Sequence, residues 1–300
     1  MPKLAVAEKN LNLDIVLFNE QTFRFKRVYK DKQMYYYGVA RHRVWKIWRV
    51  NEDEIEYEVL HSFIKSNEDT DKDVFNDFFS LQEDFDPWID EWKKDSYFKK
   101  LYENNPAMFG IRILTQDVFE NLFLGLLFLK TPTQRIYAVI EKFCKVFGTR
   151  FKYQNMNFYS FPTVEHLTKL KNLKKTLTDN QFELGRNDFA ELFIQVKKAG
   201  GSKFLDSLKD KDVLEARKEL MQFWLVGRKS ADFILLKSLK NYEVVPSCLK
   251  IKVLISDKYK LKLDTEKFVS KDVKFIYEFL NEKFDEYSGW IQNIFLTLDK

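Results

Sequence analysis

The sequence has little of what several protein classes depend on. Only two cysteines, Cys144 and Cys248, occur among its 300 residues, so we expect neither a disulfide framework nor a zinc cluster. The longest apolar run, residues 122–129, is far shorter than the ~20 residues of a membrane-spanning helix. The N-terminus has no apolar stretch typical of a secretory signal. These absences predict an intracellular protein without a membrane segment.

Glycine and histidine are also scarce. The nine glycines form no phosphate-binding loop, and the three histidines lie far apart in the sequence. We therefore expect no metal and no cofactor. Apolar residues make up 45% of the chain and charged residues 32%, which is typical of a globular protein that can bury a core.

The charge is unevenly distributed along the chain. Residues 1–150 carry 23 basic and 24 acidic side chains, a net charge of −1, whereas residues 151–300 carry 27 and 21, a net charge of +6. On charge alone, an ordinary soluble surface explains this excess better than a polyanionic partner does. If the partner is a nucleic acid, the second half is predicted to contact it.

Two kinds of periodicity divide the chain. Within residues 12–62, clustered or alternating β-branched and aromatic residues at 35–39, 44–50 and 55–59 predict an antiparallel meander. Helical spacing begins near residue 74 and dominates from there on. It predicts helices at 116–129, 134–147 and 163–177, and another that ends at Gly200-Gly201.

The pattern over residues 212–239 carries the clearest chemical content. Helical spacing over 212–224 is interrupted at 225–228 and resumes at Lys229, which predicts a helix-hairpin-helix with Gly227 relieving the turn. Free backbone N–H groups at the start of the second helix are a ready phosphate site. Arg228 and Lys229 stand where the helix dipole disfavours cations, which indicates a compensating anion or a chemical role. The alternative is a plain turn with solvated basic residues.

Read outward from residues 226–232, the sequence resembles the helix-hairpin-helix DNA glycosylases, and among them the eukaryotic 8-oxoguanine DNA glycosylase/lyases. The matching segments occur in family order, at residues 11–17, 21–24, 78–81, 110–117, 120–123, 143–148, 159–162, 200–201 and 287–292. The resemblance implies an α+β fold. An N-terminal antiparallel sheet domain, residues 1–105, would pack on a helical body, residues 106–289, and residues 290–300 are expected to join the sheet-bearing lobe.

The resemblance also implies a reaction. In that family the damaged base is extruded into a pocket, a lysine matching Lys229 attacks the sugar C1′ to form a Schiff base, and β-elimination follows. An aspartate stabilises the cationic sugar, and Cys248 occupies its place here. A thiol near pH 7 supplies no fixed negative charge. The loss of such a group costs on the order of 10²–10⁴ in rate.

Other matched positions concern DNA and the base. Lys250 replaces a histidine that lies near a phosphate in the family. Arg135 matches the arginine that reads the orphaned cytosine, and residues 130–132 replace the tandem asparagines beside it. The family also has wedge residues that insert into the DNA. They align with Glu183-Leu184 or, if the alignment is shifted, with Gly185-Arg186. The candidate DNA contacts are Val226, Gly227, Arg228, Arg135, Arg186 and Lys250.

The implied base pocket is altered as well. Gln292 matches the reader of the base edge, but the pocket cysteine is Phe233 and the stacking phenylalanine is Leu296. Leu225 stands where the first hairpin glycine belongs. Glu20 replaces the glycine whose carbonyl approaches the oxidised base, which predicts a blocked pocket.

Three hypotheses follow. The first is an 8-oxoguanine glycosylase homologue of the base-excision repair lineage whose chemistry is lost or very weak, with weak, absent or redirected DNA binding. The second is an active glycosylase and abasic-site lyase in which apolar surroundings lower the pKa of Lys229. The third is an interaction scaffold for a protein or ribonucleoprotein partner. The family implies a monomer that binds duplex DNA in the nucleus.

Overall fold

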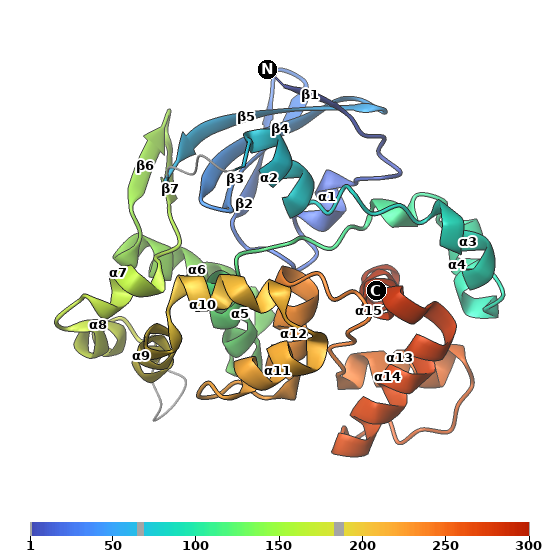
Figure 1. Ribbon diagram of the computed structural model, residues 1–300. Coiled ribbons are helices and arrows are strands. Elements are labelled where there is room, and N and C mark those ends of the chain that lie inside the picture. Colours follow the sequence, from blue (N-terminus) through green and yellow to red (C-terminus); the bar gives the residue numbers. More distant parts are fainter. Residues whose placement is uncertain (1, 65–68, 183–188, 300) are drawn as a thin grey trace.

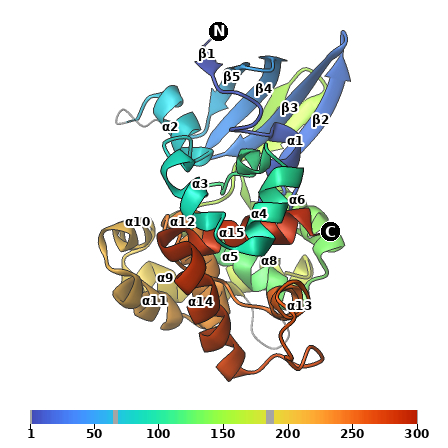
Figure 2. The ribbon, with the colours of Figure 1, turned by 90° about the vertical axis from the view of Figure 1, so that its right-hand side faces the viewer.

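In the computed structural model, which describes residues 2–64, 69–182 and 189–299, a β-sheet lies at one end of the molecule and helices fill the rest (Figures 1 and 2). The sheet is antiparallel with strand order β1-β5-β4-β3-β2. Its strands are β1 (Lys3–Ala5), β2 (Phe25–Lys30), β3 (Gln33–Ala40), β4 (Arg43–Asn51) and β5 (Glu54–Ser62). Strands β2 to β5 form the predicted meander, and β1 adds to β5.

One face of the sheet is covered by the short helix α1 (Leu13–Val16) and by α2 (Asp71–Phe78). Phe75 of α2 stacks on Tyr57 at a centroid distance of 4.6 Å and meets Trp45 edge-on at 5.7 Å. Thr70 caps α2 through a reciprocal hydrogen bond with Asp73. The alternation of apolar residues along the strands therefore builds a core between sheet and helix.

The other face packs against a hairpin of β6 (Arg150–Tyr153) and β7 (Met156–Tyr159), where Phe158 joins the cluster of Tyr37 and Val39. This hairpin lies inside residues 106–289, which we predicted to be helical, so that prediction is wrong there. Each strand has only four residues, too few for alternation to outweigh the helical pattern on both sides.

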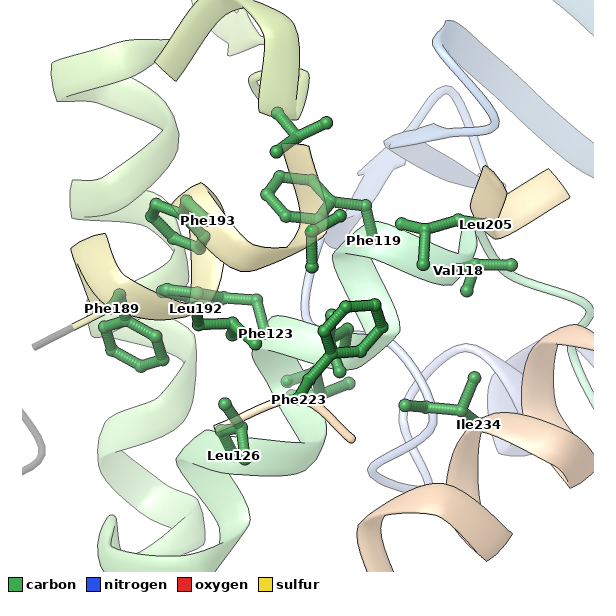
Figure 3. Packing of buried hydrophobic residues seen from close by; sticks show 14 of the residues in the cluster. Val118, Phe119, Phe123, Leu126, Phe189, Leu192, Phe193, Leu205, Phe223 and Ile234 are labelled. Carbon is green, nitrogen blue, oxygen red and sulfur yellow. The ribbon is translucent and has the colours of Figure 1, made fainter. Parts of the chain in front are cut away.

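Helix α5 (Val118–Lys130) is the centre of the first helical group and is apolar on nearly every side. Figure 3 shows its Phe119 and Phe123 among the side chains of α9; Phe123 lies 4.5 Å from Phe189 between ring centroids, and Phe119 lies 5.4 Å from Phe193. Around α5 lie α6 (Thr133–Phe147), α7 (Val164–Thr168), α8 (Leu173–Asp179), α9 (Phe189–Ala199), α10 (Ser202–Ser207), η2 (Leu208–Asp210), α11 (Val213–Met221) and α12 (Arg228–Ser238). The predicted helices near 116–129 and 134–147 are confirmed.

The single helix predicted over residues 163–177 is wrong, because α7 and α8 are separate. Val164, Leu167, Leu170 and Leu173 follow one another in steps of three. In a helix of 3.6 residues per turn each such step rotates the side chain back by about 60°. One straight helix would therefore carry them around to its opposite side, whereas a break after α7 lets Leu167 and Leu173 face the same core.

The second helical group contains α3 (Asp86–Trp92), α4 (Ser96–Asn104), η1 (Met108–Gly110), α13 (Leu249–Lys258), α14 (Ser270–Phe284), η3 (Asp285–Tyr287) and α15 (Ser288–Leu298). Trp92 and Phe98 pack with Phe284, and Phe85 meets Trp290 edge-on. Residues 85–104 thus pack with the C-terminal helices, although we placed them in the sheet domain. The C-terminal helix α15 packs with α13, α14 and residues 85–98, which belong to the lobe that we expected it to join, and not in the cluster of the sheet; Figure 2 shows it below the sheet.

No described helix is long and apolar enough to cross a membrane. A search of the same residues finds no cluster of histidine, cysteine or carboxylate side chains that could hold a metal ion.

Candidate functional site

The predicted helix-hairpin-helix is present as α11, a turn over residues 222–227, and α12. The turn differs from the prediction in one respect. Gly227 has an ordinary φ of −88°, and the left-handed conformation falls on Leu225, with a φ of 66°. Glycine adopts that region freely, whereas another residue pays about 1 kcal/mol for it. A Cβ at Gly227 would meet no atom within 4 Å, so this side of the turn is open to an approaching ligand.

The two cations at the start of α12 have different surroundings. Arg228 donates to the carboxylate of Asp232 at 3.1 Å, and Arg217 of α11 donates to its other oxygen at 2.6 Å. The buried Asp232 is thus the compensating anion for Arg228. Lys229 is exposed and makes no ion pair or hydrogen bond through its ammonium with a described residue. Of the two cations at the start of α12, only Lys229 therefore lacks a compensating anion among the described residues.

Lys229 lines a cavity of about 330 Å³ where the sheet domain and both helical groups meet. One face of α12 contributes five residues, at steps of one, three, three and one from Lys229 to Lys237. Helices α15 and α5 and the segment before α13 complete the wall. All six residues that we predicted for the reaction and the pocket line it: Lys229, Cys248, Gln292, Glu20, Phe233 and Leu296.

Cys248 is the N-cap of α13 and faces this cavity, half-buried. Its thiol makes no capping hydrogen bond, unlike the carboxylates of Asp117 and Asp212, which cap α5 and α11. Lys229 and Cys248 thus share one cavity from different helices. The hypothesis of an active enzyme requires apolar residues to enclose Lys229. The Lys229 side chain is instead exposed.

Glu20 has a φ of 69°, so its backbone holds a conformation that favours glycine, although its side chain is glutamate. The side chain is exposed at the edge of the cavity and does not fill it. The cavity beside Glu20 holds about 330 Å³, and the blocking of a bound base by Glu20 stays a prediction.

The middle of the cavity is apolar. Phe233 of α12 meets Phe128 of α5 edge-on at a centroid distance of 5.7 Å, and Leu296 of α15 lines the same space. Gly125 of α5 faces Phe233, and a Cβ there would lie at an ordinary contact distance of 3.4 Å from the ring. These walls suit a flat, apolar-faced guest.

The inner end of the cavity is polar, and sequence reasoning missed it. Lys237 of α12 is 6% exposed, and its ammonium donates to Gln21 Oε1 at 2.6 Å and to Asn293 Oδ1 at 2.7 Å. Burial lowers the pKa of Lys237 to about 7. Gln292 donates to the Pro246 carbonyl at 3.1 Å. Spacing places Lys237 eight residues after Lys229, on the same side of the helix, but does not predict its burial.

The predicted DNA contacts lie at different places around the hairpin. Arg135 and Lys250 are exposed in the first turns of α6 and α13. Val226 is buried in the core of the first helical group, so its side chain contacts no DNA. Residues 183–186, with the wedge and Arg186, lie outside the described part of the chain.

The sequence of this chain is similar to those of known DNA glycosylases. Residues 3–122 match the model of the 8-oxoguanine DNA glycosylase N-terminal domain. The N-glycosylase/DNA lyase OGG1 of Arabidopsis thaliana is 27% identical over 97% of this chain and 78% of its own length. The N-glycosylase/DNA lyase of Saccharomyces cerevisiae is 26% identical over 98% of this chain and 85% of its own.

The solved structure of MBOgg1 "in complex with low affinity DNA ligand" superposes with a TM-score of 0.78 at 25% identity, over 97% of this chain and 92% of that one. The chain is thus similar to 8-oxoguanine DNA glycosylases in its N-terminal domain, over nearly its whole sequence and in its fold. This glycosylase homologue keeps the fold of the base-excision repair lineage, with the sheet and helical body that the resemblance implied.

Proposed function

We propose that this glycosylase homologue binds duplex DNA but excises 8-oxoguanine very slowly or not at all. The observation that carries the proposal is the pairing of Lys229 with Cys248 across the cavity. Glu20 is the only carboxylate among the described residues that line the cavity, and it stands exposed at the edge. A developing sugar cation beside Lys229 would therefore have no buried negative charge opposite it.

Binding to DNA is supported by the cations around the cavity. Lys229, Arg135 and Lys250 are exposed in the first turns of α12, α6 and α13. Helix dipoles disfavour cations at these positions, whereas phosphates are attracted both to the cations and to the free N–H groups. The three first turns thus suit a phosphate backbone that passes the mouth of the cavity.

A residual lyase activity is the second candidate, because Lys229 remains without an ion-pair partner among the described residues. An amine at that place can add to the open aldehyde of an abasic site, forming a Schiff base with release of water. β-Elimination then breaks the 3′ C–O bond and leaves the strand cut. This reaction needs no base extrusion and no departure of a purine.

Borohydride trapping on two duplexes tests the proposal, one with an 8-oxoguanine·cytosine pair and one with an abasic site, with Lys229→Ala as the matched control. We expect salt-dependent binding of both duplexes and no trapped adduct on the oxidised base. An adduct on the abasic site that disappears in Lys229→Ala assigns the residual lyase. A Lys229-dependent adduct on the oxidised base contradicts the proposal, and so does the absence of any duplex binding at low salt.

A further inference from the structure

The buried amine of Lys237 is held by two neutral oxygens. Its Nζ lies 2.6 Å from Gln21 Oε1 and 2.7 Å from Asn293 Oδ1. Lys252, which is also buried, contacts a carboxylate instead, that of Asp272 at 2.8 Å. Burying an ammonium without a carboxylate is costly. The surroundings of Lys252 therefore suit an ammonium, whereas those of Lys237 suit a neutral amine.

The number of acceptors around Lys237 leads to the same conclusion. An ammonium has three N–H donors, whereas a neutral amine has two and a lone pair. Gln21 and Asn293 accept two hydrogen bonds, and no third acceptor contacts Nζ in the described part of the chain. The third donor of an ammonium would be buried without a partner there. Burial lowers the pKa of Lys237 to about 7, in agreement with this geometry.

The other titratable side chains at the cavity leave Lys237 without an ion pair. Among the described residues that line the cavity they are Glu20, Lys229 and Cys248. Glu20 and Lys229 are exposed, and no hydrogen bond or ion pair joins any of the three to Lys237. The free lone pair of its amine is therefore what Lys237 offers to a guest.

The cavity gives small molecules access to this amine. Lys237 lines a space of about 330 Å³, which is within the usual range of small-ligand pockets. Phe233, Leu236 and Leu296 give the space apolar walls. A lysine that is desolvated in an apolar pocket is activated as a nucleophile toward carbonyl compounds. The walls suit a carbonyl compound that is small, flat and uncharged.

We propose that Lys237 is a second reactive amine of this protein, which forms a Schiff base with small, flat aldehydes that enter the cavity. The lone pair of Nζ attacks the aldehyde carbon, and the two amine protons leave with the carbonyl oxygen as one water molecule. A C=N bond replaces the C=O bond, with no net oxidation or reduction. The reaction is independent of the proposed function, because it needs neither DNA nor Lys229.

Reductive labelling of the intact protein tests the proposal. The protein is incubated at pH 7.5 with benzaldehyde and cyanoborohydride, which traps Schiff bases, and the labelling rate of each lysine is measured by peptide mass spectrometry. An ordinary lysine is neutral to only about one part in a thousand at this pH. We therefore expect Lys237 to be labelled about tenfold faster than the exposed lysines. Lys252, buried beside Asp272, is the matched control and should stay unlabelled.

A carboxylate placed beside Lys237 should suppress this reactivity while the amine stays in place. Asn293→Asp supplies it, and Asn293 Nδ2 has no hydrogen-bond partner among the described residues that the exchange would remove. Because a nearby negative charge favours the ammonium, we expect the labelling of Lys237 to fall about tenfold in this variant. The labelling of the exposed lysines should not change.

Three results would overturn the proposal. On the wild-type protein alone, Lys237 could be labelled no faster than the exposed lysines, or Lys252 could be labelled as fast as Lys237 because the fold opens. The third result is unchanged labelling of Lys237 in folded Asn293→Asp. The wild-type comparison needs no variant, so it decides the proposal even if Asn293→Asp does not fold. No DNA is present, so failure of the proposed DNA binding is a separate result.

Discussion

Lys229 and Lys237 lie two turns apart on one face of α12 and line the same cavity, yet their surroundings are opposite. Lys229 is exposed at the mouth, in the cavity that the thiol of Cys248 also lines. Lys237 is buried at the inner end and held by two amide oxygens. The mouth carries an exposed amine, whereas the inner end carries a buried, hydrogen-bonded one. The proposed function uses this difference: the cavity would hold a base rather than remove it.

Replacing Cys248 by aspartate should have the largest effect on this contrast, because it restores a fixed negative charge beside Lys229. We expect cleavage of an abasic-site duplex to rise by about 10²-fold, a typical gain from electrostatic stabilisation of a cationic transition state. Cys248→Asn is the matched control, because asparagine and aspartate both cap a helix well and only aspartate is charged. Equal cleavage rates for the two variants, measured on denaturing gels, would contradict the electrostatic account of the mouth.

The inner end predicts a stability that depends on pH. The pKa of Lys237 is about 7 in the folded protein, against an ordinary value of 10.5. Between these values the unfolded chain binds a proton that the folded protein does not, so the free energy of unfolding rises with pH. From pH 7 to pH 9 the wild type should gain about 2 kcal/mol relative to Lys237→Met.

Urea unfolding of both proteins at pH 7, 8 and 9 measures this gain. Subtracting the Lys237→Met values removes the contribution of every other titrating group that the substitution leaves unchanged. A constant difference across the three pH values would show that Lys237 keeps its proton, and that the inner end is not the desolvated site described above.

Substitutions at Glu20 are expected to have the smallest effect, a change in stability. Its backbone is left-handed with a φ of 69°, and its side chain is exposed. Glycine at this position removes the strain but adds flexibility to the unfolded chain, for a net stabilisation of about 0.5 kcal/mol over Glu20→Ala. Thermal unfolding of the two variants compares them without the charge difference. A less stable Glu20→Gly would mean that residue 20 does not hold this conformation in solution.

Much of the fold was predictable because its signals are local. Alternation over residues 35–59 predicted three strands of the meander, and the interruption at 225–228 predicted the hairpin. The β6–β7 hairpin was missed because its strands are short, and the long helix over 163–177 was predicted because steps of three resemble helical spacing. Neither error concerns the elements that form the cavity.

The site was predictable only in part. The residues matched by resemblance do line one cavity, but their roles stay predictions. Lys237 could not be distinguished from a surface lysine by spacing, because its burial depends on Gln21 and Asn293, 216 and 56 residues away in the sequence. Spacing did not predict the left-handed conformation of Leu225, since glycine at 227 suggested that the tight turn was there; the resemblance did place the first hairpin glycine at 225.

The most direct test of a cavity that holds a base without removing it combines two readings on one sample. The wild-type protein is mixed in excess with a duplex that contains one 8-oxoguanine opposite cytosine, and both the bound fraction and the released base are followed over time. The account predicts that the duplex is bound at low salt and that base release stays within about tenfold of the protein-free rate, since the stabilising charge is missing. Release that is complete within minutes and lost in Lys229→Ala would contradict it.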